Sequence, residues 1–211
     1  QEMSRALMYR QPSRFLDVLR DVGALSVIVP ELECLFNNPG AARRCLQAVD
    51  YAARLKAPLE VRFAVLVCEL PEGLASVKDV SCRLKTPVAC REMALLVAEF
   101  HPAIDQVLTL DPETILRLLR KLDVFRRPER LPDLLMASHA CHMARQGGFS
   151  MEYPPADLWH QIAAAARSVE GGDFYRNGFR GQAVAEALDR ARLEKIADLL
   201  NAIGADQKAS R

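Results

Sequence analysis

Apolar side chains recur every three or four residues along most of this chain, which is the spacing of one face of an α-helix. Between residues 59 and 70 apolar residues occupy almost every face of the predicted helix, so we expect this helix at the centre of the core. The pattern predicts helices over 12–23, 41–56, 59–70, 76–84, 87–101, 112–122, 128–145, 157–169 and 181–202, with a turn or short helix over 25–29.

Start and stop signals bound these helices. Gly23 stands where a helix C-terminus favours a residue able to take positive φ. Asp111 followed by Pro112 predicts a helix start, with a capping carboxylate and proline in the first helical position. Pro102 is expected to kink or end the helix that contains it. Turn-forming residues predict loops at 37–40, 147–148 and 171–172.

The composition favours an all-α fold. Half of the 211 residues are hydrophobic, only 6% are aromatic, and the strong helix formers Leu and Ala dominate. The formal net charge is +1, so a site for a polyanion must be a local patch. No apolar run reaches the roughly 20 residues that span a bilayer. The six cysteines form no C-x-x-C pair, which is typical of reduced thiols and predicts a cytoplasmic protein without a membrane partner.

Cys68 and Glu69, at the end of the central helix, are the first candidates for a metal site. A metal ion needs several N, O or S ligands brought together. The four histidines do not supply them in any recognisable spacing: His101, His139, His142 and His160. We therefore interpret Cys68 as a small buried hydrophobe and Glu69 as a solvated or paired carboxylate. His101, just before Pro102, is expected to form a hydrogen bond instead of binding a metal.

His139 and His142 are three residues apart and can share a helix face, with Cys141 pointing elsewhere. No acidic residue is spaced to complete a tetrahedral ligand set with them. The sequence also lacks a G-x-S-x-G nucleophile elbow and a glycine-rich phosphate loop. We predict no metal-binding and no catalytic residue in this chain.

Two groups of basic residues are candidates for binding RNA. Three of them lie three and four residues apart on one predicted helix, where they can follow a phosphate backbone. The alternative is that both groups are solvated faces. Phe125, beside the first group, is interpreted as a core residue more readily than as a base-stacking one. The predicted RNA-binding residues are Arg117, Arg120, Lys121, Arg126, Arg127 and Arg130, and, in a loop that enters the last helix, Arg176 and Arg180.

The segment 62–73, Arg-Phe-Ala-Val-Leu-Val-Cys-Glu-Leu-Pro-Glu-Gly, resembles a stretch of the bacterial CCA-adding enzymes (tRNA nucleotidyltransferases). Segments 4–8, 18–25, 30–32, 148–149, 158–159 and 178–181 resemble the same family in order and spacing. In that family the positions of Cys68 and Glu69 hold the adjacent His and Asp that bind metal in an HD phosphohydrolase domain. A histidine expected near the 41–56 helix is also missing, and Arg44 and Cys45 stand there.

The resemblance implies that this chain is the C-terminal body and tail of such a protein, with its HD site lost. We expect an HD-like helical domain over residues 1–105 and a helical tail over 106–211, packed together as one unit. The expected partners are tRNA and an N-terminal nucleotidyltransferase head of the same polypeptide. No cofactor is expected here, whereas the head uses Mg²⁺ with CTP and ATP. The alternatives are a helical protein-interaction module and an active metal-dependent HD phosphohydrolase.

Overall fold

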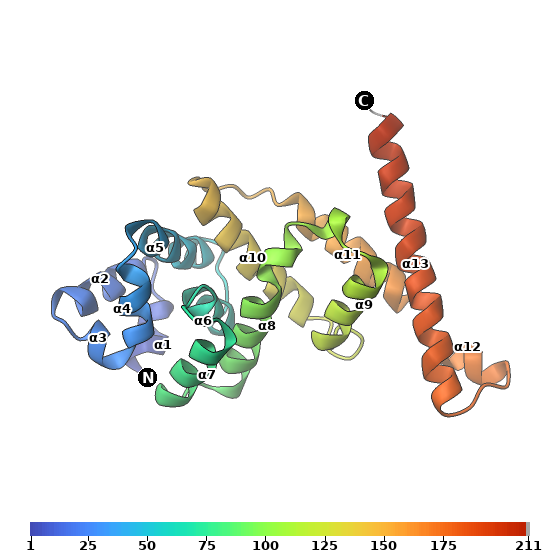
Figure 1. Ribbon diagram of the computed structural model, residues 1–211, viewed down its shortest axis with the longest axis horizontal. Helices are drawn as coiled ribbons and strands as arrows, with labels where there is room; N and C mark the ends of the chain where they lie inside the picture. Colours follow the sequence, from blue (N-terminus) through green and yellow to red (C-terminus); the bar gives the residue numbers. More distant parts are fainter. Residues whose placement is uncertain (210–211) are drawn as a thin grey trace. The chain divides into compact units, whose positions relative to one another are not determined.

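The computed structural model describes residues 1–209, with side chains as far as residue 205. Within that part of the chain there are helices and no strand, which confirms the predicted all-α fold (Figure 1). No described helix is both long enough and apolar enough to cross a membrane.

The described chain divides into two compact units. The first consists of residues 1–105 and 132–153, and the second of residues 106–131 and the chain from 154 onward. The division expected from the sequence, 1–105 and 106–211, places residues 132–153 in the tail, whereas they lie in the first unit here. Packing of the two parts as one unit stays a prediction, and residues 210 and 211 of the predicted tail lie outside the described chain.

The first unit combines short helices with three longer ones, α5, α8 and α10. Its helices are α1 (Glu2–Leu7), α2 (Ser13–Asp21), α3 (Leu25–Ile28), α4 (Pro30–Phe36), α5 (Pro39–Arg54), α6 (Leu59–Val67), α7 (Leu74–Arg83) and α8 (Val88–Ile104). Helix α10 (Arg130–Gln146) belongs to this unit from Pro132 onward.

Helix α6 forms the centre of the first unit, as its sequence predicted. Every residue from Val61 to Val67 is buried, because α8, α5 and α1 all pack against it. An α-helix that is apolar on all sides has no face for solvent, so its neighbours must surround it. This position brings the residues at its C-terminal end, Cys68 and Glu69, next to side chains of α5 and α10.

Arg62 is the one buried charged residue in this central helix, and it is 6% exposed. Its Nε donates to the carbonyl of Ala57 (2.7 Å), and its Nη1 donates to the carbonyls of Leu7 (2.8 Å) and Tyr9 (3.0 Å). Burial lowers the pKa of this guanidinium. Because a buried charge must be compensated by hydrogen bonds, Arg62 fastens the end of α1 to α6.

The second unit contains a short 3₁₀ helix, η1 (Val107–Thr109), and α9 (Pro112–Lys121), α11 (Pro154–Arg167), α12 (Gly171–Arg176) and α13 (Gln182–Ala209). Asp111 caps α9 as predicted, since its Oδ1 accepts a hydrogen bond from the Thr114 N–H (2.7 Å). Trp159 on α11 is fully buried, and α13 packs against α11, α12 and α9.

Several local features differ from the sequence predictions. Pro39 and Gly40, predicted to lie in a loop, begin α5. Residues 30–36 form α4, which the pattern did not identify. Residues 171–172, predicted as a loop, begin α12. Glycines are tolerated there because the first N–H groups of a helix need no partner within it. Pro102 does not end α8, which continues to Ile104, since a proline in the last turn removes only one hydrogen bond.

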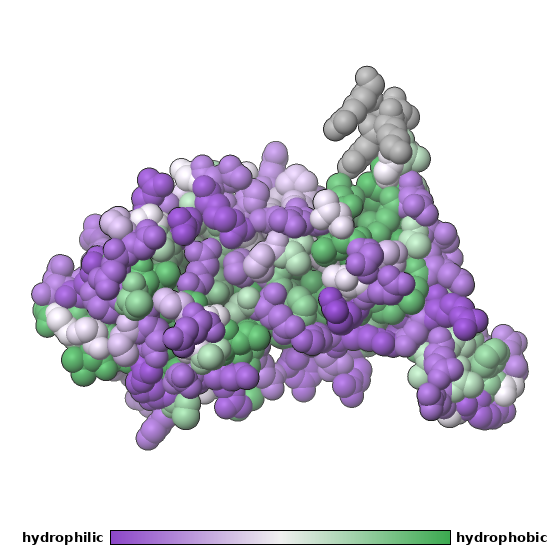
Figure 2. All heavy atoms as spheres, viewed as in Figure 1, coloured by the Kyte–Doolittle hydropathy of each residue, from purple (hydrophilic) through white to green (hydrophobic). Residues whose placement is uncertain are grey.

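The surface is mostly polar, but apolar side chains reach it over α2 and α3 (Figure 2). Val18, Val22 and Val27 are 57%, 70% and 79% exposed. Gly23, between these helices, has φ of +72°, the positive value that its position predicted.

Candidate functional site

Cys68 and Glu69 lie where α6 ends, in contact with α5 and α10. The Cys68 Sγ is buried and lies 3.6 Å from the Sγ of Cys141 on α10. Contact with Cys141 and burial raise the pKa of the Cys68 thiol. A protonated, enclosed thiol is a poor nucleophile and a poor ligand. The interpretation of Cys68 as a buried hydrophobe is consistent with this environment.

Cys45 on α5 completes a group of three buried thiols. Its Sγ lies 3.6 Å from the carbonyl oxygen of Leu66, and burial raises its pKa. Cys45, Cys68 and Cys141 line a void of about 10 Å³, together with Arg44 and Glu69. That volume is about the size of one water molecule. The described residues contain no group of three or more His, Cys, Asp or Glu side chains placed to hold a metal ion.

Glu69 is a paired carboxylate, which is one of the two states, solvated or paired, that the sequence suggested. Its Oε2 lies 3.7 Å from Nε of Arg44, and its Oε1 lies 3.7 Å from Nη1 of Arg145. The two arginines come from α5 and α10, on either side of the end of α6. A cation that bound Glu69 would have to compete with both guanidinium groups.

Asp105 is the second carboxylate at this end of the unit, and three side chains bind it. The Tyr153 hydroxyl donates to its Oδ1 (2.5 Å), Nη2 of Arg145 donates to its Oδ2 (2.7 Å), and Nδ1 of His142 lies 3.3 Å from the same oxygen. Burial alone raises the pKa of Asp105, but these hydrogen bonds outweigh it and lower the pKa overall. Arg145 therefore bridges Asp105 and Glu69 with one guanidinium.

Two buried histidines lie in the same unit. Nδ1–H of His101 donates to the carbonyl of Val97 (2.9 Å), in agreement with the predicted hydrogen bond. His139 stacks on the ring of Tyr153, with ring centroids 4.7 Å apart and 4° between the planes. Burial lowers the pKa of both imidazoles. Neutral, enclosed imidazoles of this kind belong to the core of the protein.

The sequence did not identify Asp105 as a partner of His142. Asp105 follows α8, whereas His142 is on α10, and 37 residues separate them along the chain. Spacing along one helix carries no information about such a pair. The only available signal was the acidic residue directly after a long helix, and that signal is weak.

The eight predicted RNA-binding residues all belong to the second unit. Arg117, Arg120 and Lys121 are exposed on α9, and Arg126 and Arg127 are exposed in the turn that follows. The other three are Arg130, which is half-buried at the start of α10, and Arg176 and Arg180, which are exposed at the end of α12 and in the loop after it.

Several of these cations have acidic or carbonyl partners. Arg120 forms an ion pair with Asp189 of α13. Nε of Arg126 donates to Asp123 (2.8 Å), and Nε of Arg127 lies 4.0 Å from the same carboxylate.

In the second group, Arg176 pairs with Asp173. Nη1 of Arg180 donates to the carbonyls of Tyr175 (2.8 Å) and Phe179 (2.7 Å), which fixes the loop before α13. Neutral carbonyls leave the charge of Arg180 uncompensated, whereas the Asp173 carboxylate offsets that of Arg176.

Phe125 is half-buried, and its ring is covered by a cation. The guanidinium carbon of Arg192, on α13, lies 3.6 Å from the ring centroid. The sequence offered no reason to connect Arg192 with the first basic group, because 62 residues separate it from Arg130. The packing of α13 against α9 makes the connection.

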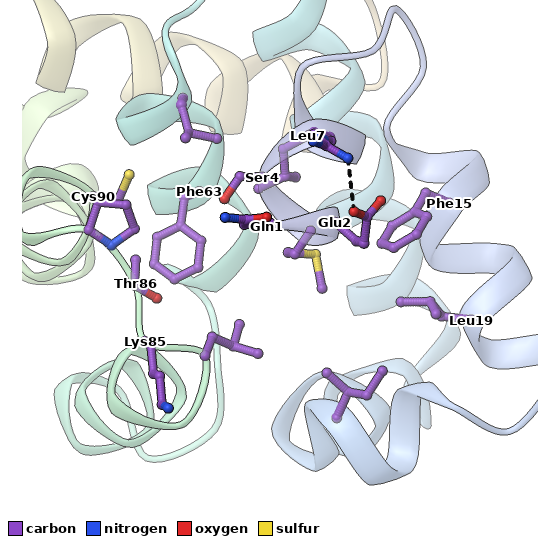
Figure 3. Close-up of a pocket in the computed structure, with 16 residues that line it drawn as sticks. Gln1, Glu2, Ser4, Leu7, Phe15, Leu19, Phe63, Lys85, Thr86 and Cys90 are labelled. Carbon is purple, nitrogen blue, oxygen red and sulfur yellow. Dashed lines mark hydrogen bonds and ion pairs between the residues drawn. The ribbon is translucent and has the colours of Figure 1, made fainter.

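A larger cavity of about 810 Å³ lies elsewhere in the first unit, among α1, α2 and the turn between α7 and α8 (Figure 3). Leu7, Phe15, Leu19 and Phe63 give it an apolar lining. Two charged groups at this cavity, Glu2 and Arg5, pair with each other at 3.1 Å. Ser4, Lys85 and Cys90 also line it, but among the described residues no hydrogen bond or ion pair joins these three into a catalytic group.

Comparison with known proteins identifies relatives over nearly the whole chain. A multifunctional CCA protein of Halorhodospira halophila is 36% identical over 225 residues, which cover 94% of this chain and 54% of the relative. A multifunctional CCA protein of Vibrio parahaemolyticus is 34% identical, covering 95% and 56%. A CCA-adding enzyme of Pseudomonas entomophila is 39% identical over 197 residues, covering 92% and 51%.

This chain is homologous to the CCA-adding enzymes. The resemblance seen in the sequence is thereby confirmed. The chain spans about half the length of these relatives, which is consistent with the C-terminal portion that the resemblance implied. No protein-family model matches the chain, and no solved structure matches it.

Proposed function

We propose that this chain is the C-terminal, tRNA-binding portion of a CCA-adding enzyme, and that it has no phosphohydrolase activity of its own. In this proposal the nucleotidyltransferase head lies elsewhere in the same polypeptide and uses Mg²⁺ with CTP and ATP. The chain described here needs no cofactor, and its location is the cytoplasm. The homology to CCA-adding enzymes supports the assignment to a protein that acts on tRNA.

The proposal of RNA binding is supported by where the eight predicted basic residues lie in the structure. All eight belong to one unit, and seven of them are exposed. Residues 106–131 alone contain six basic side chains against four acidic ones, in a protein whose net charge is only +1. A local excess of exposed positive charge is what binding to a phosphate backbone requires.

The absence of phosphohydrolase activity rests on Arg145. Metal ions that activate phosphoester hydrolysis are held by carboxylates and imidazoles whose lone pairs face one point. In this chain Arg145 already bridges Glu69 and Asp105, and three buried cysteines, Cys45, Cys68 and Cys141, line the small void beside Glu69. A guanidinium in that position repels a divalent cation and occupies the oxygens that would bind it.

Binding of labelled tRNA, followed by fluorescence anisotropy over a salt series, tests the first part. We expect log Kd to rise with log[salt], with a slope of about 0.7 to 0.9 per phosphate contact. The double variant Arg117→Gln, Lys121→Gln should lower that slope by about 1 to 2. The matched control is Arg91→Gln, an exposed arginine on α8 in the first unit, which should leave the slope unchanged. Failure of the wild-type chain to bind tRNA at 50 mM salt contradicts the proposal.

Metal analysis of the purified protein tests the second part. We expect less than 0.1 equivalent of Mn, Fe, Ni or Zn after dialysis, and no cleavage of a chromogenic phosphodiester when these ions are added. Stoichiometric metal that is lost in Glu69→Gln would revive the phosphohydrolase alternative.

The interaction-module alternative has one supporting observation, the exposed valines of α2 and α3. Val18, Val22 and Val27 present exposed apolar surface over α2 and α3. The substitution Val22→Lys with Val27→Lys distinguishes the two functions. It should leave tRNA affinity unchanged if the second unit binds RNA, whereas loss of a copurifying protein partner would favour the alternative.

A further inference from the structure

A groove of about 270 Å³ runs between α9 and α13 in the second unit. Its apolar lining comes from Leu116 and Leu193. Its charged lining includes Arg117, Arg120, Lys121 and Asp189. The groove unites cations that the sequence placed on one helix with a carboxylate from another helix, which the sequence could not anticipate.

Positive charge exceeds negative charge in this groove. Three cations of α9 face two carboxylates, Glu113 and Asp189, and Asp189 is engaged in the ion pair with Arg120. A further cation, Arg192, is one helical turn beyond Asp189 on α13. Burial and the charge of the nearby Arg120 lower the pKa of the Arg192 guanidinium.

Arg192 is held in place by a ring and not by an acid. Its guanidinium lies 3.6 Å from the centroid of the Phe125 ring, and its Nε is enclosed without an acceptor among the described residues. The like charges of Arg120 and Arg192 repel each other, and a bound anion would relieve that repulsion.

We propose that this groove binds a phosphate group of an RNA backbone. Arg117, Arg120 and Lys121 contact the phosphate oxygens, and Arg192 adds a positive charge beside Arg120, oriented by Phe125. This inference rests on the RNA-binding function proposed above. A nucleic acid is favoured over an acidic protein segment because further exposed arginines, Arg126 and Arg127, follow α9 and suit a ligand with regularly repeated charges.

Removing the charge of Asp189 should change tRNA affinity in a direction that distinguishes a phosphate site from a structural ion pair. If the groove binds phosphate, Asp189 competes with the ligand for Arg120, and Asp189→Asn should tighten tRNA binding about threefold at 100 mM KCl. If Asp189 and Arg120 only hold α9 against α13, the same substitution should weaken binding or leave it unchanged. The matched control is Asp198→Asn, an exposed carboxylate nine residues further along α13 and therefore on its opposite face, with an expected change below about 1.5-fold.

Substitutions of Arg192 should lower the affinity for tRNA, in contrast to Asp189→Asn. Arg192→Met should weaken tRNA binding about fivefold, and Arg192→Lys, which keeps the charge, should retain most of the affinity. Far-UV circular dichroism verifies that each variant is folded. If Arg192→Lys and Arg192→Met weaken tRNA binding to the same extent, the role of Arg192 is packing and the inference is overturned.

Competition identifies the class of ligand. Inorganic polyphosphate should displace tRNA from the full chain at a lower concentration of charge than polyglutamate does. The reverse order would favour an acidic protein partner and overturn the inference. If the wild-type chain binds tRNA and neither Asp189→Asn nor Arg192→Met changes its affinity, the groove is not the phosphate site, but the RNA-binding function stands. If the wild-type chain does not bind tRNA at 50 mM salt, both the RNA-binding function and the groove site are refuted.

Discussion

Replacing Arg145 by Met removes the guanidinium that bridges Asp105 and Glu69 but keeps most of the side-chain volume. The contact with Asp105 is a charge-assisted hydrogen bond of 2.7 Å, and the contact with Glu69 is longer, at 3.7 Å. Such a hydrogen bond contributes about 1.5 to 3 kcal/mol. The three side chains are 22% to 32% exposed, so solvent screens part of this energy. We expect a loss of about 2 kcal/mol in the free energy of unfolding at pH 7.

The loss should depend on pH in a defined direction. The hydrogen bonds to Asp105, including that from Arg145, lower its pKa below the ordinary 3.8. A carboxyl group with a lowered folded-state pKa stabilises the protein at pH values above its unfolded pKa, and this contribution disappears as the pH falls through the folded pKa. The difference between wild type and Arg145→Met should therefore be largest at pH 7 and shrink below about pH 4.

Urea unfolding followed by far-UV circular dichroism at pH 7, 5, 4 and 3.5 measures this difference. In thermal melts at pH 7 the variant should lose about 4 to 8 °C, at roughly 2 to 4 °C per kcal/mol for a chain of this size. The exposed Arg91→Met on α8 is the control, and its effect should stay within about 0.5 kcal/mol. A destabilisation that is the same at pH 7 and pH 3.5 would refute the electrostatic role of Arg145.

Three further substitutions test the helix ends and the core by thermal and urea unfolding. Asn38 accepts hydrogen bonds from the N–H groups of Gly40 and Ala41, so Asn38→Ala should cost about 1 kcal/mol, whereas the neighbouring Asn37→Ala should cost less than about 0.5. Trp159→Ala should cost about 3 to 5 kcal/mol, because it leaves a large cavity in the second unit; a loss below about 1 would contradict its burial. Gly23→Ala should destabilise by about 1 kcal/mol because of its positive φ, and Gly204→Ala, inside α13, should stabilise by up to about 1; equal signs for the two would refute the backbone argument.

The periodic features of the fold could be predicted from the sequence. The central position of α6 follows from a helix that is apolar on all sides, and the start of α9 follows from Asp111 and Pro112. Short elements were less accessible, because α4 and α12 contain seven and six residues, too few for a periodic pattern to become distinct from noise.

In the candidate site, too, local features could be predicted from the sequence and tertiary contacts could not. Cys68, Glu69 and His101 could each be interpreted locally, since a lone thiol or imidazole without partners is best buried or hydrogen-bonded. The partners themselves could not be predicted. Asp105 with Arg145, and Arg120 with Asp189, are pairs from helices distant in the chain, and only tertiary packing brings them within reach.

The hydrogen bonds of Arg62 set a limit on how this chain can be shortened. Two of its three carbonyl acceptors belong to the first nine residues, so a fragment that starts at Arg10 would leave the guanidinium enclosed in the core with only Ala57 to bind. Such a fragment should express poorly or refold with lower cooperativity, although it retains the whole of α6. The first nine residues are thus an integral part of the folding unit, and any dissection of the protein into autonomous pieces must retain them.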